Sequence, residues 1–384
     1  FACTNYELEK SPFAKNGYYA NIKSGVGFTP EHMAGFFYIQ EPSASSAVTI
    51  LDPKPGMKVL DMCAAPGSKS TQISEMLEQE GLLVVNEIHP TRARVLLENI
   101  ERCGSANTIV LNNDPKDISK AFPEFFDMVL CDAPCSGEGM FRKEDQAVEQ
   151  WSLENVQACA LRQSYILEEA YKCLKPGGTM VYSTCTFAIE ENELCMQKFI
   201  QEHPDMHLVP IEVDFGRKAF DLGCHTDYAR RIFPMDGGEG HFIAKLQKDV
   251  TSTESTVKLM RSQALPKETK EFFDEFFVNQ YPYYFVKNNK IYGGTQPFYE
   301  VGKCHLLRHQ VFLGEMEKNR FTPSHALFMS AYTKFQNTLN LQEEDVIRYM
   351  RGEQLNLPCK KGWYAVCYHG VVIGGAKSDG TALK

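Results

Sequence analysis

The sequence of 384 residues predicts an α/β fold, in which a parallel, doubly wound Rossmann-like sheet precedes a smaller α+β region. Three observations predict it. Between residues 58 and 201, short apolar runs of strand length alternate with helix-length segments, a spacing typical of parallel strands with crossover helices. Several of these runs end abruptly in an acidic residue, as strands do when they lead into ligand-binding loops. After residue 256 the alternation stops, and short β-like runs follow.

The segment before the first predicted strand contains little regular structure. Residues 1–28 are polar and aromatic without a helical period, and we interpret them as the tail of an earlier domain plus a connector. The chain begins with Phe1 rather than Met, and we expect residues to be missing before it and after Lys384. The elements predicted next are a short helix over 29–35, an aromatic strand over 36–43 that Pro42 closes, and a helix over 43–51.

The alternating region predicts five strands and the helices between them. Small-residue loops follow the apolar runs, and Gly81, Gly104 and Lys175-Pro-Gly-Gly178 end helices. The predicted strands are 58–62, 82–87, 108–114, 126–132 and 179–184, and the predicted helices are 68–79, 90–103, 155–173 and 189–201. Residues 228–246 predict a hairpin that completes the sheet.

The domain prediction follows this pattern. We expect a catalytic domain over residues 29–247, a polar linker over 248–256 and a C-terminal region over 257–384 that divides near residue 321. The elements predicted in that region are a helix over 268–277, β-like runs around Ile291, Phe298 and His305, a helix over 343–350, and strands over 362–367 and 371–373.

Charge is distributed unevenly. The first 256 residues hold 23 basic and 37 acidic side chains, a net of −14, whereas the last 128 hold 17 and 12, a net of +5. The acidic net charge of the whole chain argues against non-specific nucleic-acid binding. The basic and aromatic C-terminal third is nevertheless compatible with an RNA partner.

Composition excludes other classes. No apolar run approaches the roughly 18–20 residues that a membrane span needs, so we expect no membrane partner. The 13 cysteines are scattered without repeated CxxC spacing, which indicates reduced thiols in a cytoplasmic protein and no structural metal site. Most of them are expected to be inert core residues.

The loop after the first predicted strand indicates a ligand site. Asp61 ends the strand, and the small residues that follow let a ligand approach the backbone before a helix begins near Ser68. Neither the glycine pattern of a nicotinamide site nor that of a phosphate loop is present.

Acidic residues end the next strands. Glu87 can bind the hydroxyls of a ribose, Asp114 can accept a hydrogen bond from an adenine amino group, and Asp132 follows in the same sheet. Each acid taken alone is more commonly a helix N-cap or a solvated strand end. Three strand-end acids in register, around the point where the strand order of one sheet reverses, favour an adenosine ligand without phosphates. S-adenosyl-L-methionine (SAM) is such a ligand.

Two thiols follow buried strands in the same way. Cys135 lies in Asp132-Ala-Pro-Cys-Ser-Gly137, and Cys185 lies in Tyr182-Ser-Thr-Cys-Thr186. A single cysteine at a strand end is more often structural. Because the fourth and fifth parallel strands are expected to be neighbours, the two thiols are predicted to face one cleft as a functional pair.

These motifs resemble a known family. Cys63-Ala-Ala-Pro-Gly-Ser-Lys69, Asp132-Ala-Pro-Cys-Ser-Gly137 and Ser183-Thr-Cys185 together are similar to the RNA cytosine-5 methyltransferases with the Sun-type domain. The Tyr38-Ile-Gln-Glu-Pro-Ser43 run and the C-terminal region resemble the bacterial RsmF-like branch, which modifies 16S ribosomal RNA. The resemblance covers residues 29–247 most specifically, and it implies a PUA-like RNA-binding fold near the C-terminus.

The resemblance implies a SAM-dependent methyltransferase that forms 5-methylcytosine. By this likeness, Cys185 attacks C6 of the cytosine, and Cys135 assists removal of the C5 proton and release of the product. Asp132 binds the N3/N4 edge of the base, and Lys69 lies near the reacting centre, where its charge can lower a thiol pKa.

The same resemblance assigns the cofactor site. Glu87 is expected at the ribose, Asp114 at the adenine and Asp132 close to the cofactor. The methionine part is expected at Cys63, Ala64, Ala65, Pro66, Gly67, Ser68 and Lys69.

The target base must leave its stack to reach such a pocket. Tyr38, Phe141 or the loop over 138–143 is expected to line its path, and Arg142 and Lys143 are expected to meet phosphates unless they are merely a solvated pair. His241 stands where the family often has a second aromatic residue, and we expect it to be structural.

Several alternatives stay open. The substrate is expected to be 16S ribosomal RNA, free or within the 30S subunit, with transfer RNA as the alternative. A non-catalytic RNA-binding or ribosome assembly factor is a further alternative, which both thiols, Asp132 and Lys69 argue against. An amino-directed methyltransferase typically has Asn-Pro-Pro-Tyr where this chain has Asp132-Ala-Pro-Cys135. A DNA cytosine methyltransferase would use the Pro-Cys thiol as its nucleophile, and the presence of Cys185 argues against that class. We expect no DNA partner, and a monomer.

Overall fold

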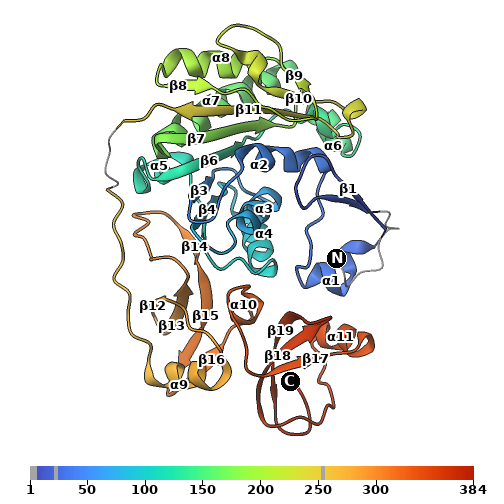
Figure 1. The fold of residues 1–384 in the computed structure, drawn as a ribbon, viewed down its shortest axis with the longest axis vertical. Coiled ribbons are helices and arrows are strands. Elements are labelled where there is room, and N and C mark those ends of the chain that lie inside the picture. Colours follow the sequence, from blue (N-terminus) through green and yellow to red (C-terminus); the bar gives the residue numbers. More distant parts are fainter. Residues whose placement is uncertain (1–6, 21–24, 252–255) are drawn as a thin grey trace.

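A sheet of ten strands organises the molecule (Figure 1). The computed structural model describes residues 7–20, 25–251 and 256–384. From one edge to the other, the strands are β14 (Leu306–His309), β5 (Thr108–Leu111), β4 (Leu82–Asn86), β3 (Lys58–Asp61), β6 (Phe126–Asp132), β7 (Leu174–Thr184), β11 (His241–Lys248), β10 (Arg230–Ile232) and β9 (Arg217–Lys218), with β8 (Met206–Leu208) pairing with β11.

The five central strands are parallel, as the alternation of apolar runs predicts. The chain order reverses at β3, which has β4 on one side and β6 on the other. Strands β6 and β7 are neighbours, with Asp132 opposite Ser183. The predicted hairpin is present, because β10 and β11 pair antiparallel and β11 closes on β7. The predicted doubly wound sheet is therefore confirmed.

Both faces of this sheet are buried. Neighbouring residues of one strand enter different apolar clusters: Val59 packs on one face and Leu60 on the other, because successive side chains of a strand alternate. Strands buried on both faces read as continuous apolar runs. The helices on the Val59 face are α2 (Ser46–Leu51), α3 (Ser68–Met76) and α4 (Pro90–Arg102), and those on the Leu60 face are α5 (Pro115–Ala121), α7 (Leu153–Cys173) and α8 (Glu193–Glu202).

Two small sheets follow the main one. The first consists of β12 (Tyr283–Lys287), β13 (Lys290–Gly294), β15 (Val311–Glu317) and β16 (Arg320–Pro323), with α9 (Lys267–Phe276) and α10 (His325–Met329). The second consists of β17 (Thr338–Asn340), β18 (Gly362–Tyr368) and β19 (Val371–Ser378), with α11 (Glu343–Met350). The remaining elements are β1 (Leu8–Lys10), β2 (Tyr18–Ala20), α1 (Pro30–Met33) and α6 (Asp145–Gln150).

The predicted aromatic strand over residues 36–43 is wrong. Residues 37–41 have no regular structure, and a 3-10 turn spans Pro42–Ser45. The Glu41 carboxylate accepts hydrogen bonds from the backbone N–H groups of Ser43 and Ala44. Pro42 therefore opens a capped turn, which its fixed φ favours, instead of closing a strand.

Other differences concern element ends. Helix α5 was not predicted, although Asp114 caps it and Pro115 opens it. Strand β7 begins at Leu174, five residues before the predicted 179, and directly follows α7. Part of the predicted linker, residues 252–255, and part of the predicted N-terminal remnant, residues 1–6 and 21–24, lie outside the described residues.

Candidate active site

The two predicted thiols meet at the carboxyl edge of the sheet. Because β6 and β7 are parallel neighbours, the loops that follow them leave the sheet at the same edge. The Sγ atoms of Cys135 and Cys185 are 3.1 Å apart, and the backbone N–H of Cys185 donates to Cys135 Sγ at 3.3 Å. The structure thus brings together two side chains that the strand order predicts to be close.

Cys135 holds its proton tightly. Its contact with Cys185, reinforced by burial, raises the pKa of the Cys135 thiol well above the ordinary value. Lys69 is electrostatically coupled to Cys185, since the pKa of Lys69 is raised by Asp132, Asp61 and Cys185 against the opposing effect of burial. The Lys69 ammonium is therefore close enough to Cys185 for the two groups to interact electrostatically.

Asp132 is held by donors on both carboxylate oxygens. Oδ2 lies 2.7 Å from Lys69 Nζ, and Oδ1 accepts a hydrogen bond of 2.7 Å from Ser183 Oγ. Burial by itself would raise the pKa of the Asp132 carboxyl, but Lys69 and His241 outweigh burial and hold this pKa well below its usual range. The side chain is 27% exposed, so an ionised carboxylate faces the site and can accept further hydrogen bonds.

The loop between β3 and α3 is fixed by its backbone carbonyls. Arg92 donates to the carbonyl of Ala65 at 2.9 Å, and Asn99 donates to that of Pro66 at 2.9 Å. Gly67 has a φ of +115°, which lets the chain turn directly into α3 at Ser68. The first N–H groups of α3 and the positive end of its dipole therefore lie beside the loop.

Glu87 lies just beyond β4 and is 3% exposed. Its Oε1 accepts a hydrogen bond from the backbone N–H of His89 at 2.8 Å, and its Oε2 lies 3.3 Å from Arg92 Nη1. Arg92 therefore connects Glu87 to the Ala65 carbonyl, so one side chain links two segments of the predicted cofactor site.

Asp114 has a structural role in the free protein. It is the N-cap of α5, and its Oδ1 accepts from both the backbone N–H of Lys116 and the hydroxyl of Tyr165. The helix-capping interpretation of this acid is thus correct, and its use by an adenine stays a prediction.

The sequence singled out Asp61 only as the end of a strand, yet this acid is fully buried in the site. Its Oδ2 accepts a hydrogen bond of 2.7 Å from Ser70, whereas Oδ1 has no hydrogen-bond partner among the described residues. Burial raises the pKa of Asp61 to about 7. The signal was the position of an acid directly before the small-residue loop.

Glu191 and Gln163 hold the Cys135 loop and were not predicted. The backbone N–H of Ser136 donates to Glu191 Oε2 at 3.1 Å, and Gln163 Nε2 donates to the same oxygen at 2.7 Å. Gln163 also donates to the carbonyl of Pro134. Neither residue lies in a loop motif, so only the tertiary structure shows that they position this loop.

The predicted base path is partly occupied by protein contacts. Arg142 and Lys143 each lie 3.5 Å from a carboxylate oxygen of Glu239. The guanidinium of Arg102, the last residue of α4, lies over the ring of Tyr38, 5.5 Å from the centroid of that ring. The loop over 138–143 is therefore tied to the hairpin of β10 and β11, next to the thiols.

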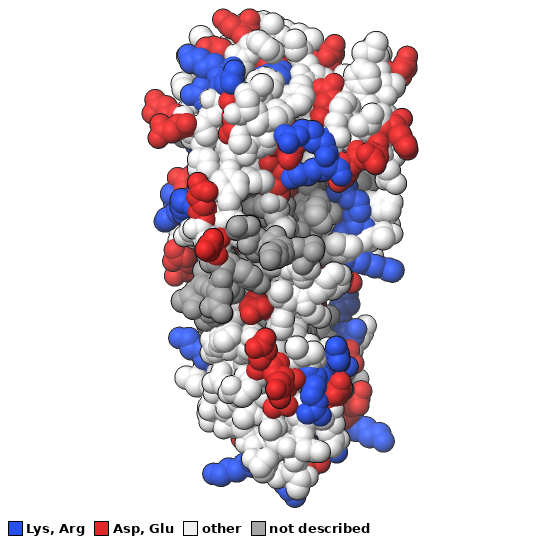
Figure 2. All heavy atoms as spheres, turned by 90° about the vertical axis from the view of Figure 1, so that its right-hand side faces the viewer, with Lys and Arg blue, Asp and Glu red and all other residues white. Residues whose placement is uncertain are grey.

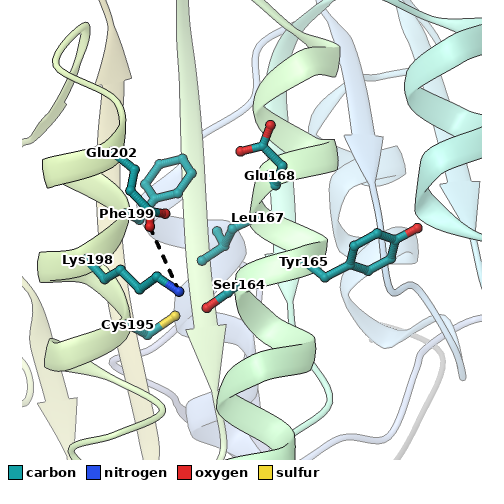
Figure 3. A pocket seen from close by; sticks show the side chains of 8 residues that line it. All are labelled: Ser164, Tyr165, Leu167, Glu168, Cys195, Lys198, Phe199 and Glu202. Atoms are coloured by element: carbon teal, nitrogen blue, oxygen red, sulfur yellow. Dashed lines mark ion pairs between the residues drawn. The ribbon is translucent and has the colours of Figure 1, made fainter.

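A separate pocket of about 260 Å³ lies between α7 and α8 (Figure 3). It contains none of the predicted site residues, and a Lys198–Glu202 ion pair crosses one side of it. Its lining residues are Ser164, Tyr165, Leu167, Glu168, Cys195, Lys198, Phe199 and Glu202. We assign the chemistry to the strand ends instead, because the two thiols and the ionised carboxylate meet there.

The described part of the chain holds neither a metal-ligand cluster nor a membrane-spanning helix. No group of three or more His, Cys, Asp or Glu side chains is placed there to hold a metal ion. Within the same residues, no helix combines the length and the apolar character that crossing a bilayer requires.

Comparison with protein families gives three adjoining matches. Residues 48–247 match the model of a family described as 16S rRNA methyltransferase RsmB/F. Residues 271–330 match the RsmF rRNA methyltransferase first C-terminal domain, and residues 336–384 match the methyltransferase RsmF PUA domain.

Individual proteins agree with these matches. A ribosomal RNA small subunit methyltransferase F from Aeromonas salmonicida (strain A449) is 31% identical to this chain. The alignment has 401 positions and covers 99% of this chain and 84% of the relative. A methyltransferase homolog from Pyrococcus horikoshii has 32% identity and a TM-score of 0.57 over 64% of this chain and 79% of its own. NSun6 from Pyrococcus horikoshii, solved with SFG, has 29% identity and a TM-score of 0.53 over 62% of this chain and 61% of its own.

Proposed function

The chain belongs to the 16S rRNA methyltransferase RsmB/F family, and we propose that it forms 5-methylcytosine in 16S ribosomal RNA through a covalent bond from Cys185 to C6 of the base. The chain is a SAM-dependent RNA methyltransferase, as the sequence predicts. One observation carries the cytosine-5 chemistry: two thiols 3.1 Å apart lie beside an ionised carboxylate that a lysine holds.

The site residues fit the predicted cofactor, SAM, which the family membership confirms. Asp61 Oδ1 is a buried acceptor without a hydrogen-bond partner among the described residues, and Glu87 is a buried acid beside the same loop. Both suit a ligand with a cationic group and hydroxyls. We propose that residues Cys63 to Lys69 hold its methionine part, Glu87 its ribose and Asp114 its adenine, with Asp132 close by. When bound, SAM supplies an electrophilic methyl group.

Cys185 is the proposed nucleophile. C5 of cytosine is a poor nucleophile by itself, but a bond from Cys185 Sγ to C6 moves the electron pair of the C5–C6 double bond to C5, which can then accept a methyl group. The C5 proton must then leave, and the S–C6 bond breaks as the double bond re-forms. Lys69 supports this role, because its charge acts on Cys185.

Cys135 is proposed to assist the second half of the reaction. It lies in contact with Cys185, so it reaches the same face of the base. Its raised pKa keeps Cys135 protonated in the free protein, so this proton must first pass to solvent; the thiolate that results is strongly basic and can then take up the C5 proton. Asp132 is proposed to accept a hydrogen bond from the N4 amino group on the N3/N4 edge of the base and so to stabilise the adduct.

The proposed substrate is 16S ribosomal RNA, the RNA of the small ribosomal subunit for which the relatives are named. The relative from Aeromonas salmonicida is named for the small subunit, and residues 336–384 match a PUA domain. On the face in Figure 2, Lys and Arg side chains of the described residues lie among Asp and Glu side chains. Such a surface favours binding by shape and local contacts over non-specific attraction.

Further parts of the proposal concern the setting. We propose a monomer that acts in the cytoplasm on 16S ribosomal RNA, free or within the 30S subunit, and not on DNA. We also propose the domain division at residues 29–247, 248–256 and 257–384, with residues 1–28 as part of an RNA-binding subdomain.

The test supplies labelled SAM together with 30S subunits, naked 16S ribosomal RNA or transfer RNA, and maps the labelled base. We expect 5-methylcytosine in 16S ribosomal RNA. Label found only in transfer RNA would mean that the substrate is transfer RNA and not 16S ribosomal RNA. Absence of 5-methylcytosine from every RNA would defeat the proposed function.

A further inference from the structure

His241, which stands where the family often has a second aromatic residue and is expected to be structural, lies beside Asp132 in the candidate active site. It is the first residue of β11, where the next residue, Phe242, pairs with Thr184 of β7. His241 is therefore level with the point where the chain passes from Thr184 to Cys185. The side chain is 4% exposed, so the ring is enclosed by the site.

Both ring nitrogens of His241 face oxygen acceptors. Nδ1 lies 3.2 Å from the carbonyl oxygen of Gly240, and Nε2 lies 3.7 Å from Asp132 Oδ1. Nε2 is buried and has no hydrogen-bond partner among the described residues. A carbonyl and a carboxylate can only accept, so an N–H at Nε2 would have the Asp132 carboxylate as its acceptor.

Charged groups from three elements surround this ring. Asp132 of β6 lies 3.7 Å from Nε2, Lys69 of α3 pairs with Asp132, and Glu41, which caps the turn at Pro42–Ser45, is electrostatically coupled to the ring. Glu41 is fixed in place, because its Oε1 accepts a hydrogen bond of 3.0 Å from the backbone N–H of Glu239, two residues before His241. The ring of His241 therefore lies in a site where two carboxylates, Asp132 and Glu41, are fixed by other hydrogen bonds.

We propose that His241 is a positioning residue, whose Nε2 donates a hydrogen bond to Asp132 Oδ1 when the target base is bound. This inference rests on the proposed function, in which Asp132 binds the base. The separation of 3.7 Å is too long for a hydrogen bond, but catalytic contacts often shorten only in the complex. Ser183 and Lys69 already hold Asp132, and His241 supplies the third donor that fixes the carboxylate plane.

A purely steric role makes a different prediction. Phenylalanine has a ring of similar size without nitrogen, so a packing role would tolerate it. Glutamine lacks the ring but can place its amide nitrogen near the position of Nε2, whereas asparagine reaches only the position of Nδ1. The three substitutions therefore separate hydrogen bonding at Nε2 from packing.

The experiment measures kcat and KM for 16S ribosomal RNA and the affinity for SAM in the variants His241→Phe, His241→Gln and His241→Asn. For His241→Phe we expect kcat to fall about 10- to 100-fold with unchanged SAM affinity, because one charge-assisted hydrogen bond is lost. We expect His241→Gln to stay within about 3-fold of the unchanged protein, since its amide replaces the donor. His241→Asn should resemble the phenylalanine variant.

Full activity of His241→Phe, or equal losses in His241→Gln and His241→Asn, would overturn the proposal. If His241→Phe does not fold, as thermal unfolding will show, the ratio of the glutamine and asparagine variants decides alone. The unchanged protein is assayed first for 5-methylcytosine. Its failure to make that product would defeat the proposed function and is thereby distinguished from a failure of the His241 assignment.

Discussion

At the scale of single residues, the site depends on how two similar thiols differ in their surroundings. Cys135 and Cys185 are 50 positions apart in the chain and 3.1 Å apart in space. Cys135 accepts the N–H of Cys185 and has a raised pKa, whereas Cys185 lies within the influence of Lys69. The same functional group therefore suits two roles, because the neighbours differ.

The thiol roles can be separated by substitution. Cys185→Ala should abolish methylation and form no adduct, since the attacking sulfur is gone, whereas Cys135→Ala should accumulate protein covalently bound to RNA because release is blocked. Denaturing gels with labelled RNA measure the adduct. Cys224→Ala, a loop cysteine outside the site, is the control and should behave like the unchanged protein. The reverse pattern would exchange the two assignments.

Asp61 predicts a pH-dependent stability effect. A buried acid with a pKa of about 7 is protonated in the fold below that pH, whereas the unfolded chain ionises it near its ordinary 3.8. The unfolded state therefore binds fewer protons between about pH 4 and 7, and stability falls as the pH rises through this window. Above pH 7 the full cost is present, up to about 4 kcal/mol.

Asp61→Asn should therefore raise the unfolding temperature of the cofactor-free protein at pH 8 and have little effect at pH 4.5. Thermal unfolding at both pH values measures the difference. The exposed Asp145→Asn is the matched control and should show no such dependence. An equal effect of Asp61→Asn at both pH values would contradict the raised pKa of Asp61.

At the scale of elements, strands and helices place the site by fixing the ends of loops. The order of β3, β6 and β7 aligns the loops that carry Lys69, Cys135 and Cys185. Helix α8 holds the loop after Cys185, because Arg231 of β10 donates to both Glu193 at the start of α8 and the carbonyl of Phe187. This buried ion pair thus supports the segment of the proposed nucleophile.

Glu193→Gln should destabilise the protein. Arg231 is 2% exposed and would lose its counter-charge, a change that typically costs about 3–5 kcal/mol. Urea unfolding measures the loss in free energy of unfolding. The control is Glu202→Gln in the exposed Lys198–Glu202 pair of α8 (Figure 3), where the loss should be below about 1 kcal/mol. Equal effects of both variants would show that the buried pair has no special role.

At the scale of the whole molecule, the C-terminal region contributes one strand, β14, to the main sheet. Strand β14 pairs antiparallel with β5 and covers what would otherwise be an exposed sheet edge (Figure 1). The buried Arg308 of β14 donates to the carbonyl of Ser105 at 2.6 Å. Removal of this region would therefore expose the edge strand β5, in addition to removing RNA contacts.

Two truncations test this arrangement. Removal of residues 336–384 keeps β14 and should weaken RNA binding with little effect on SAM affinity. Removal of residues 257–384 strips β14 from β5, whose far end leads to Asp114, and should lower both the unfolding temperature and the SAM affinity. Calorimetry and thermal unfolding measure these changes. Unchanged SAM affinity in the longer truncation would mean that β5 does not need β14.

The sequence by itself determined the parallel sheet, because strands buried on both faces must be apolar runs between helices. It also determined the strand-end acids and thiols, since the loops at the carboxyl ends of such a sheet carry its chemistry. Only the tertiary structure decided that β14 joins β5, that Tyr165 donates to Asp114, that Glu191 holds the Cys135 loop and that His241 lies beside Asp132. These contacts join residues far apart in the chain, and no local period or spacing specifies such pairs.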